Sequence, residues 1–341
     1  MTHRIVGGSL IAAVIAVAAL GISNSAQAQD KSQGKTQDKP QDKLRVIVFP
    51  GLSNLAQFAA ESQGFYKKRN LAVELINTPN SGELRKGLAE GRYDIAHGGV
   101  DNAVAQVEND KTDLFIFMGG NSGLNSLFVQ PEIKSYEQLR GTTMAVDAPN
   151  TAFALLLYKM LDVKGIKRAD YKVQPVGATH LRLAAMLKDK TYSAAMLSPP
   201  GSIQAARAGL KDLGSSVSVV GPYQSDGGWV LRSWGKANAA TLTRYIQANV
   251  EGIRWVLNPA NRAALTAIVA ARLKLPPDVV TESLKLADDQ KGFATDARFD
   301  LDGFRNVLKL RADMLGTWGG KPPASDKYLD LSYYDRALKG L

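Results

Sequence analysis

Short apolar runs alternate with amphipathic segments along most of the chain. Residues 44–49 form a β-rich run that ends at a Pro-Gly pair, as expected of a buried strand. In residues 55–62 the apolar positions recur at i, i+3, i+4 and i+7, which is the spacing of one helix face. The same alternation continues and predicts strands at 71–76, 93–96 and 113–118 and helices at 83–90 and 101–108. Such alternation predicts a largely parallel sheet with helices on its faces.

A polar, glycine-rich run at residues 119–126 interrupts this series, and a second series follows. It predicts strands at 127–129, 142–146, 171–176, 193–197 and 216–220, and helices at 151–161, at 180–188 and after the pair Pro199-Pro200. Residues 229–231, behind Gly227-Gly228, are a candidate return strand. From about residue 237 the pattern becomes helical, with predicted helices at 242–257, 264–272, 277–287 and 301–315. We therefore expect an α/β protein with two halves, joined by crossings near 119–126 and 221–228.

The first 43 residues have a different character. A short basic segment, an apolar stretch over residues 5–22 and the small-residue site Ala26-Gln27-Ala28 together form the pattern of a secretory signal peptide. We expect cleavage after Ala28, although the apolar stretch approaches the length of a membrane anchor. Residues 29–43 repeat the triplet QDK and contain almost nothing apolar, which predicts a disordered tether. The mature chain is thus expected in the periplasm.

Composition narrows the possible chemistry. The 341 residues include no Cys, which excludes disulfides, thiolate metal sites and cysteine nucleophiles. The formal net charge of +10 is spread along the chain, so it predicts solubility rather than nucleic-acid binding. Gly98-Gly99 is a lone pair without dinucleotide-binding spacing, and neither a P-loop, an H-E-x-x-H nor a G-x-S-x-G motif occurs. We therefore predict no catalytic residue, metal or cofactor.

Four stretches carry a resemblance to a known family: residues 59–71, 87–96, 133–141 and 184–199. In this order they resemble the periplasmic solute-binding proteins of ABC importers with the type II fold, in the group that binds taurine, alkyl sulfonates, nitrate and thiamine-pyrimidine precursors. The resemblance implies two lobes, 44–122 with 229–341 and 123–228, and C-terminal helices packed on the first lobe. It also implies a monomer that closes on a small solute and delivers it to an inner-membrane permease and its ATPase.

Ligands of open α/β sheets bind outside the carboxyl ends of the strands, so the loops at those ends are the candidate site. None of these loops contains Lys or Arg, so the sequence shows no basic side chain that would clamp an anion. The N-termini of the helices that follow these loops could still hold an anion. Together with the crossings, the loops supply the predicted ligand-binding residues: Phe49, Asn54, Asn80, Ser81, His97, Asp101, Asn102, Asn121, Asn125, Asn150, Thr151, Ser198 and Trp229.

Two of these residues allow a second interpretation. Asp101 is either the N-cap of its own helix or a ligand contact that favours an amine or a ring N–H. His97 is either a packed loop histidine or a hydrogen-bond donor to the ligand. The solute itself stays open between a sulfonate or taurine-like compound and a thiamine-pyrimidine-like compound. A ligand-sensing partner of a receptor and, less favoured, an exported enzyme on the same fold are the alternative functions.

Overall fold

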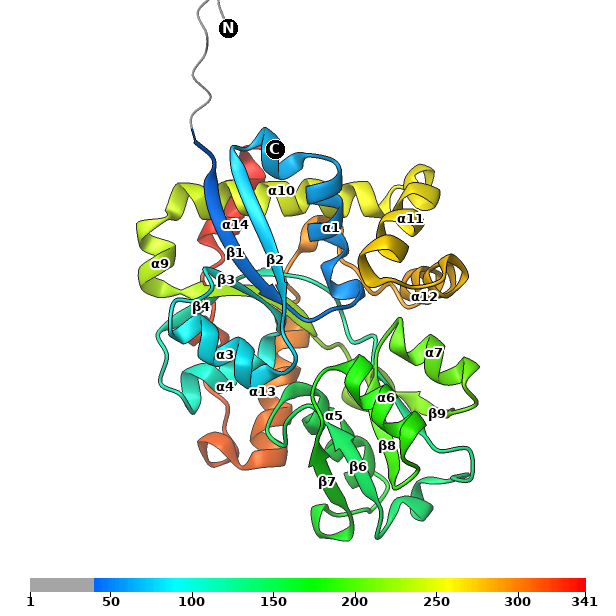
Figure 1. Cartoon of the computed structure of the whole chain (residues 1–341). Coiled ribbons are helices and arrows are strands. Elements are labelled where there is room, and N and C mark those ends of the chain that lie inside the picture. Colours follow the sequence, from blue (N-terminus) through cyan, green and yellow to red (C-terminus); the bar gives the residue numbers. More distant parts are fainter. Residues whose placement is uncertain (1–39) are drawn as a thin grey trace, which may run out of the picture. The chain divides into compact units, whose positions relative to one another are not determined.

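Two five-stranded sheets form the framework of the computed structural model, which describes residues 40–341 (Figure 1). The predicted signal peptide and residues 29–39 of the predicted tether lie outside the described residues. The two sheets confirm the predicted α/β fold with two halves. Each sheet together with the helices packed on it is called a lobe below, lobe 1 for the sheet that contains the first strand and lobe 2 for the other.

The sheet of lobe 1 has the strand order β2-β1-β3-β10-β4. β1 pairs in parallel with β2 and β3, whereas β10 is antiparallel to both β3 and β4. β10 is the return strand expected near residues 229–231, and it brings the chain back from the second sheet. The bounds are β1 Asp42–Val48, β2 Leu71–Asn77, β3 Ile95–Gly99, β4 Leu114–Gly119 and β10 Asp226–Leu231.

β1 begins two residues earlier than the sequence predicts, inside the expected tether. Asp42 faces Leu71 in the ladder, and its carboxylate accepts a hydrogen bond of 2.8 Å from the Thr241 hydroxyl. It also pairs with Arg244. A polar strand start is held here by side chains about 200 positions away, which a local pattern cannot reveal.

The sheet of lobe 2 has the order β7-β6-β8-β5-β9. β6 is parallel to β7 and β8, and β5 runs antiparallel to β8 and β9. Both sheets are therefore mixed, each with a parallel part and antiparallel strands. The bounds are β5 Ser126–Val129, β6 Thr143–Val146, β7 Lys172–Pro175, β8 Tyr192–Leu197 and β9 Lys211–Ser215.

Helices cover both faces of the lobe 1 sheet, and the strand sequence explains why. Along β1, Val46 and Val48 pack into a core with α1 and α10, whereas Ile47 points to the opposite core with α3 and α4. The α-helices are α1 Leu55–Ser62, α2 Phe65–Lys68, α3 Ser81–Ala89, α4 Val100–Glu108, α5 Ala152–Asp162, α6 Thr179–Lys188, α7 Gly201–Arg207, α8 Val217–Val220, α9 Arg232–Ala237, α10 Ala239–Leu257, α11 Arg262–Leu273, α12 Pro277–Asp289, α13 Leu301–Leu315 and α14 Ser332–Lys339. Within residues 40–341, none of these helices combines the length and apolarity needed to cross a membrane.

The two chain crossings pair with each other and with the C-terminal part. Ser122 bridges to Gln224, and Asn121 bridges to Phe293. Of the C-terminal helices, α10 and α14 lie on the lobe 1 sheet, whereas α13 contacts α4 of lobe 1 and α5 of lobe 2. The sequence resemblance implies that the C-terminal helices pack on the first lobe, and α13 adds contacts with the second.

One predicted strand is wrong. Residues 216–220 include the short helix α8, and the strand β9 precedes it at Lys211–Ser215. The three valines of α8 have high β propensity, but α8 packs on α5 and ends at Gly221, whose φ is 72°. β9 contains a single large apolar residue, Leu213, because it is an edge strand with one neighbour. The sequence of β9 therefore lacks the apolar alternation from which a strand is predicted.

Candidate functional site

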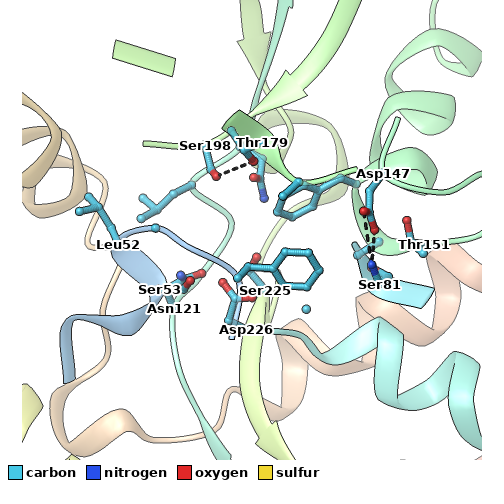
Figure 2. Close-up of a pocket in the computed structure, with 18 of the residues that line it drawn as sticks. Leu52, Ser53, Ser81, Asn121, Asp147, Thr151, Thr179, Ser198, Ser225 and Asp226 are labelled. Carbon is cyan, nitrogen blue, oxygen red and sulfur yellow. Dashed lines mark hydrogen bonds between the residues drawn. The ribbon is translucent and has the colours of Figure 1, made fainter. Parts of the chain in front are cut away.

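A cavity lies between the two sheets and the crossings, with about 730 Å³ of empty space including the part that is open to solvent. Loops at strand ends of both lobes line it, as Figure 2 shows for Ser53 and Ser81 from lobe 1 and Thr179 and Ser198 from lobe 2. The cavity wall includes these residues of the sequence-predicted set: Phe49, Ser81, Asn102, Asn121, Asn125, Thr151 and Ser198.

Three other predicted residues stand outside this wall because their side chains serve the fold. Asn54 donates from Nδ2 to the carbonyl of Phe49 at 2.6 Å, and it makes no side-chain cap on α1. Asn80 caps α3 by accepting the N–H of Glu83 at 2.8 Å. Trp229 is fully buried, and its indole N–H donates to Gln106 at 3.3 Å. These contacts hold the loops in place.

Asp101 is neither the N-cap nor a residue of the cavity wall. It is buried in the first turn of α4, and its carboxylate makes two 2.7 Å hydrogen bonds with Arg311 of α13. Burial alone would lower the pKa of Arg311, but Asp101 outweighs that effect and holds this pKa above its ordinary value. Arg311 also donates to the carbonyl of Asn150 at 3.0 Å, so Asn150 contributes its backbone to the same network.

His97 lines a second, smaller cavity, which has about 390 Å³ of empty space including the part open to solvent and shares Ser53 and Asp226 with the first. Its Nδ1 is 3.2 Å from Nε2 of Gln57, and its Nε2 is 3.0 Å from the hydroxyl of Tyr245. Burial lowers the pKa of His97 to about 3, so the ring is neutral at physiological pH. These contacts agree with the packed histidine that was one of its two interpretations.

The main cavity contains a basic residue that the loop sequences do not reveal. Arg182 comes from α6, is 1% exposed and lines the wall. It donates hydrogen bonds to the carbonyls of Gly177 and Met196 and to the hydroxyl of Thr179, and no carboxylate pairs with it in the part of the chain that the structure describes. Burial lowers the pKa of Arg182 to about 10, and Asp147 partly opposes this shift.

Two carboxylates share the cavity with Arg182. Asp147 accepts from the hydroxyl of Ser81 and, at 3.4 Å, from its N–H, which joins the loop after β6 to the start of α3 across the cavity (Figure 2). Asp226, at the start of β10, lines both cavities. Burial raises the pKa of Asp226 to about 6, against the lowering effect of a hydrogen bond with Asn121.

Two signals in the sequence point to the residues that were missed. Thr179, Arg182, Leu183 and Met186 occupy i, i+3, i+4 and i+7 of α6, so an arginine stands in the apolar stripe of a helix that begins at a strand end. Asp226 directly precedes Gly227-Gly228, where the chain returns to the first sheet. A charged residue at either place is costly unless it has a partner or a ligand.

These groups suit noncovalent capture of a small molecule. Hydroxyls, amides and three charged side chains surround a space walled by Phe49, Phe153 and Leu124. Among residues 40–341, no three His, Asp or Glu side chains gather as they would around a metal ion. The site can hold, orient and desolvate a solute that touches both lobes.

Comparison with known proteins agrees with this arrangement. The model of the NMT1-like family matches residues 37–270, and the chain belongs to that family. Its fold is the type II fold of periplasmic solute-binding proteins. No curated protein matches the chain.

Three solved structures have this fold. The ligand-binding component of an ABC-type import system from Staphylococcus aureus, with zinc bound, has a TM-score of 0.74 at 15% identity, over 87% of this chain and 99% of its own. The periplasmic nitrate-binding protein NrtA from Synechocystis PCC 6803 has a TM-score of 0.74 at 14% identity, over 88% of this chain and 89% of its own. The alkanesulfonate-binding protein SsuA from Xanthomonas axonopodis pv. citri, bound to MOPS, has a TM-score of 0.67 at 15% identity, over 85% of this chain and 97% of its own.

Proposed function

We propose that this protein is the periplasmic substrate-binding subunit of an ABC importer. It captures a small polar organic solute between its two lobes and delivers it to the permease and ATPase at the inner membrane. The observation that carries the proposal is the cavity whose wall is shared by both lobes and by the segments that connect them. A solute that touches both lobes favours the arrangement in which they approach each other, and a permease can recognise that arrangement.

The sequence supports export, and the site supports binding without chemistry. The predicted signal peptide directs the chain to the periplasm. The chain contains no Cys, and its buried histidine at position 97 is held by Gln57 and Tyr245 rather than facing the main cavity. The solute belongs to the classes expected from the sequence, a sulfonate or taurine-like compound or a pyrimidine-like compound.

Native mass spectrometry of the exported protein purified from a bacterial periplasm tests this proposal. We expect one noncovalently bound small molecule per chain, released unchanged on denaturation, and an increase in thermal stability when it is returned in excess. At a concentration one hundred times Kd, a single-site ligand stabilises the folded state by about 2.7 kcal/mol. Chemical conversion of the bound compound would show an enzyme instead. Binding with no effect of gene deletion on uptake would favour a sensing role.

A further inference from the structure

The charged groups of the main cavity have hydrogen-bond partners in the protein but no salt bridge among the described residues. Three charged side chains line it: Asp147, Arg182 and Asp226. Asp147 is held by Ser81. Neither Arg182 nor Asp226 forms a salt bridge with any residue between 40 and 341, and burial disfavours the charged form of each. The cavity thus contains one cation and two carboxylates without a salt bridge among residues 40–341, and of the two carboxylates Asp147 is the one whose charge acts on Arg182.

Arg182 presents a donor to the lobe 2 side of the cavity. Four of its five guanidinium N–H groups are used, two on the Met196 carbonyl, one on Gly177 and one on the Thr179 hydroxyl. One N–H on Nη1 remains. Ala178 provides no side-chain cap for α6, so the start of this ten-residue helix adds partial positive charge beside the guanidinium. This side of the cavity fits an acidic group.

Asp226 belongs to an acceptor-rich side of the same cavity. Figure 2 shows Thr179 and Ser198 at the top of the cavity and Asn121 and Asp226 below, with the open space between them. Asn102 and Asn125 also line the cavity. This side fits a group that donates hydrogen bonds and carries positive charge.

No cation of the described chain occupies this side in place of a ligand. The elements packed around Asp226 contribute His97 on β3, Tyr223 on the returning crossing, and Asp101 on α4 with its partner Arg311. His97 is held by Gln57 and Tyr245, and Arg311 is committed to Asp101. Burial raises the pKa of Tyr223, which keeps it neutral. A positive counterpart for ionised Asp226 would therefore be supplied by the solute.

We propose that the cavity selects a bipolar solute, with an acidic group held by Arg182 and a protonated nitrogen held by Asp226. Phe49 and Phe153 line the wall as well, so the body that joins the two groups is apolar or aromatic. The guanidinium carbon of Arg182 is 5.6 Å from the centre of the Phe153 ring, which places an aromatic surface beside the acid-binding side. This inference rests on the proposed function and specifies the solute it requires.

Two matched sets of probes test the inference on the full chain by thermal shift and calorimetry. The first set is 3-(aminomethyl)benzoate, 3-methylbenzoate and 3-methylbenzylamine, and the second is 4-aminobutane-1-sulfonate, butane-1-sulfonate and butylamine. A neutral aminopyrimidine accompanies them. In at least one set we expect the bipolar member to bind about 100-fold more tightly than either truncated member. Equal affinity of a truncated member, or binding of the pyrimidine alone, would overturn the inference but leave the proposed function. Absence of binding by every probe would overturn the inference, and the proposed function would be contradicted only if native mass spectrometry also shows no bound small molecule.

Variants test whether Asp226 binds the protonated nitrogen of the bipolar probe. Asp226→Asn should weaken the bipolar probe about 100-fold and leave the acid-only probe unchanged, while Asp302→Asn, an exposed change of the same type on α13, should alter neither. As the pH falls below about 6, protonation of Asp226 should weaken the bipolar probe in the wild type and not in Asp226→Asn. Equal loss of both probes in Asp226→Asn, or identical pH profiles of the two proteins, would refute the assignment.

Discussion

The molecule contains two buried arginines in contrasting surroundings. Arg311 and Arg182 are each 1% exposed. Arg311 meets the carboxylate of Asp101 with two hydrogen bonds, and its pKa lies above the ordinary value. Arg182 meets backbone carbonyls and a hydroxyl, and burial lowers its pKa. The protein itself supplies the counter-ion of Arg311. Arg182 lines the cavity, so a ligand can supply its counter-ion.

The same contrast separates two other buried groups. His97 has a neighbour within 3.2 Å on each ring nitrogen and stands outside the main cavity. Asp226 has no cationic partner in the described residues and stands inside it. Burial by itself therefore does not mark a ligand-binding residue. A candidate ligand-binding residue is instead a buried charged side chain that lines a cavity and has no salt bridge within the protein.

The largest effect should come from breaking the completed ion pair. Arg311→Met leaves the Asp101 carboxylate buried without a partner, so we expect the free energy of unfolding to fall by about 3–5 kcal/mol. Urea denaturation measures this change. The double variant Asp101→Leu/Arg311→Met should regain a large part of the loss, because no charge then remains buried. A loss below about 1 kcal/mol in the single variant would show that the pair is not a structural element.

Arg182→Met should act mainly on binding. Loss of a charge-assisted hydrogen bond to the ligand costs up to about 3 kcal/mol, or about 100-fold in Kd. Stability should fall less than in Arg311→Met, by about 1–3 kcal/mol, because carbonyls lose their donors but no opposite charge is stranded. Calorimetry and urea denaturation of the same sample separate the two effects. A larger loss of stability than in Arg311→Met would reverse the contrast between the arginines.

His97 should make the protein sensitive to acid without affecting binding. The pKa of His97 is about 3 in the folded protein and 6.5 as the ordinary value, so the unfolded chain binds the proton first as the pH falls. Its contribution to stability is complete above pH 6.5, and about 2 kcal/mol is lost by pH 5.

His97→Asn provides the control for this acid sensitivity. The variant removes the titrating ring, so it should flatten the pH dependence of the unfolding free energy between pH 7 and 5. Solute affinity should stay unchanged, since the side chain is outside the main cavity. A loss of affinity with unaltered pH dependence would instead return His97 to the ligand-binding set.

Asp226 should change the free energy of unfolding with pH in the direction opposite to His97. Its pKa rises on folding from 3.8 to about 6, so ionisation destabilises the unliganded protein, and stability falls as the pH rises through this window. Asp226→Asn should therefore stabilise the unliganded protein by up to about 3 kcal/mol at pH 8 and by only about 0.5 kcal/mol at pH 4. Thermal unfolding at both pH values measures this difference. Stabilisation of equal size at both would show that ionisation of Asp226 is not the cause.

The smallest effect should come from the exposed ion pairs that join α7 to α12. Arg207 contacts Asp278 at 2.5 Å and Glu282 at 2.8 Å, and all three side chains are substantially exposed. Because water screens such pairs, Arg207→Ala should lower the free energy of unfolding less than Arg182→Met or Arg311→Met does, and less still at high salt. Denaturation at two ionic strengths measures it. A cost as large as that of Arg311→Met would show that burial does not separate the two kinds of pair.

The fold was accessible from the sequence where local patterns determine it, and the site only in part. Alternating strands and helices predicted both sheets, and the strand-end rule predicted Ser81, Thr151 and Ser198 in the loops that line the cavity. The partner of Asp101 is 210 positions away, and no local pattern connects Asp101 with Arg311.

Arg182 was not predicted as a site residue, for a related reason. Its helix begins at a strand end, but Arg182 lies in the first turn of that helix and not in one of the strand-end loops. Long-range pairing and side-chain reach from a helix are properties of the folded chain. They decide which charges are left for a ligand.

The contrast between the two arginines is tested most directly by one calorimetric comparison. The probe is the tightest-binding member of the two sets, titrated into wild type, Arg182→Met and Arg311→Met at a temperature where circular dichroism shows all three folded. We expect Kd to rise about 100-fold in Arg182→Met and to stay within about tenfold of the wild type in Arg311→Met. Unchanged affinity in Arg182→Met, or equal losses in both variants, would contradict the assignment of Arg182 to the solute.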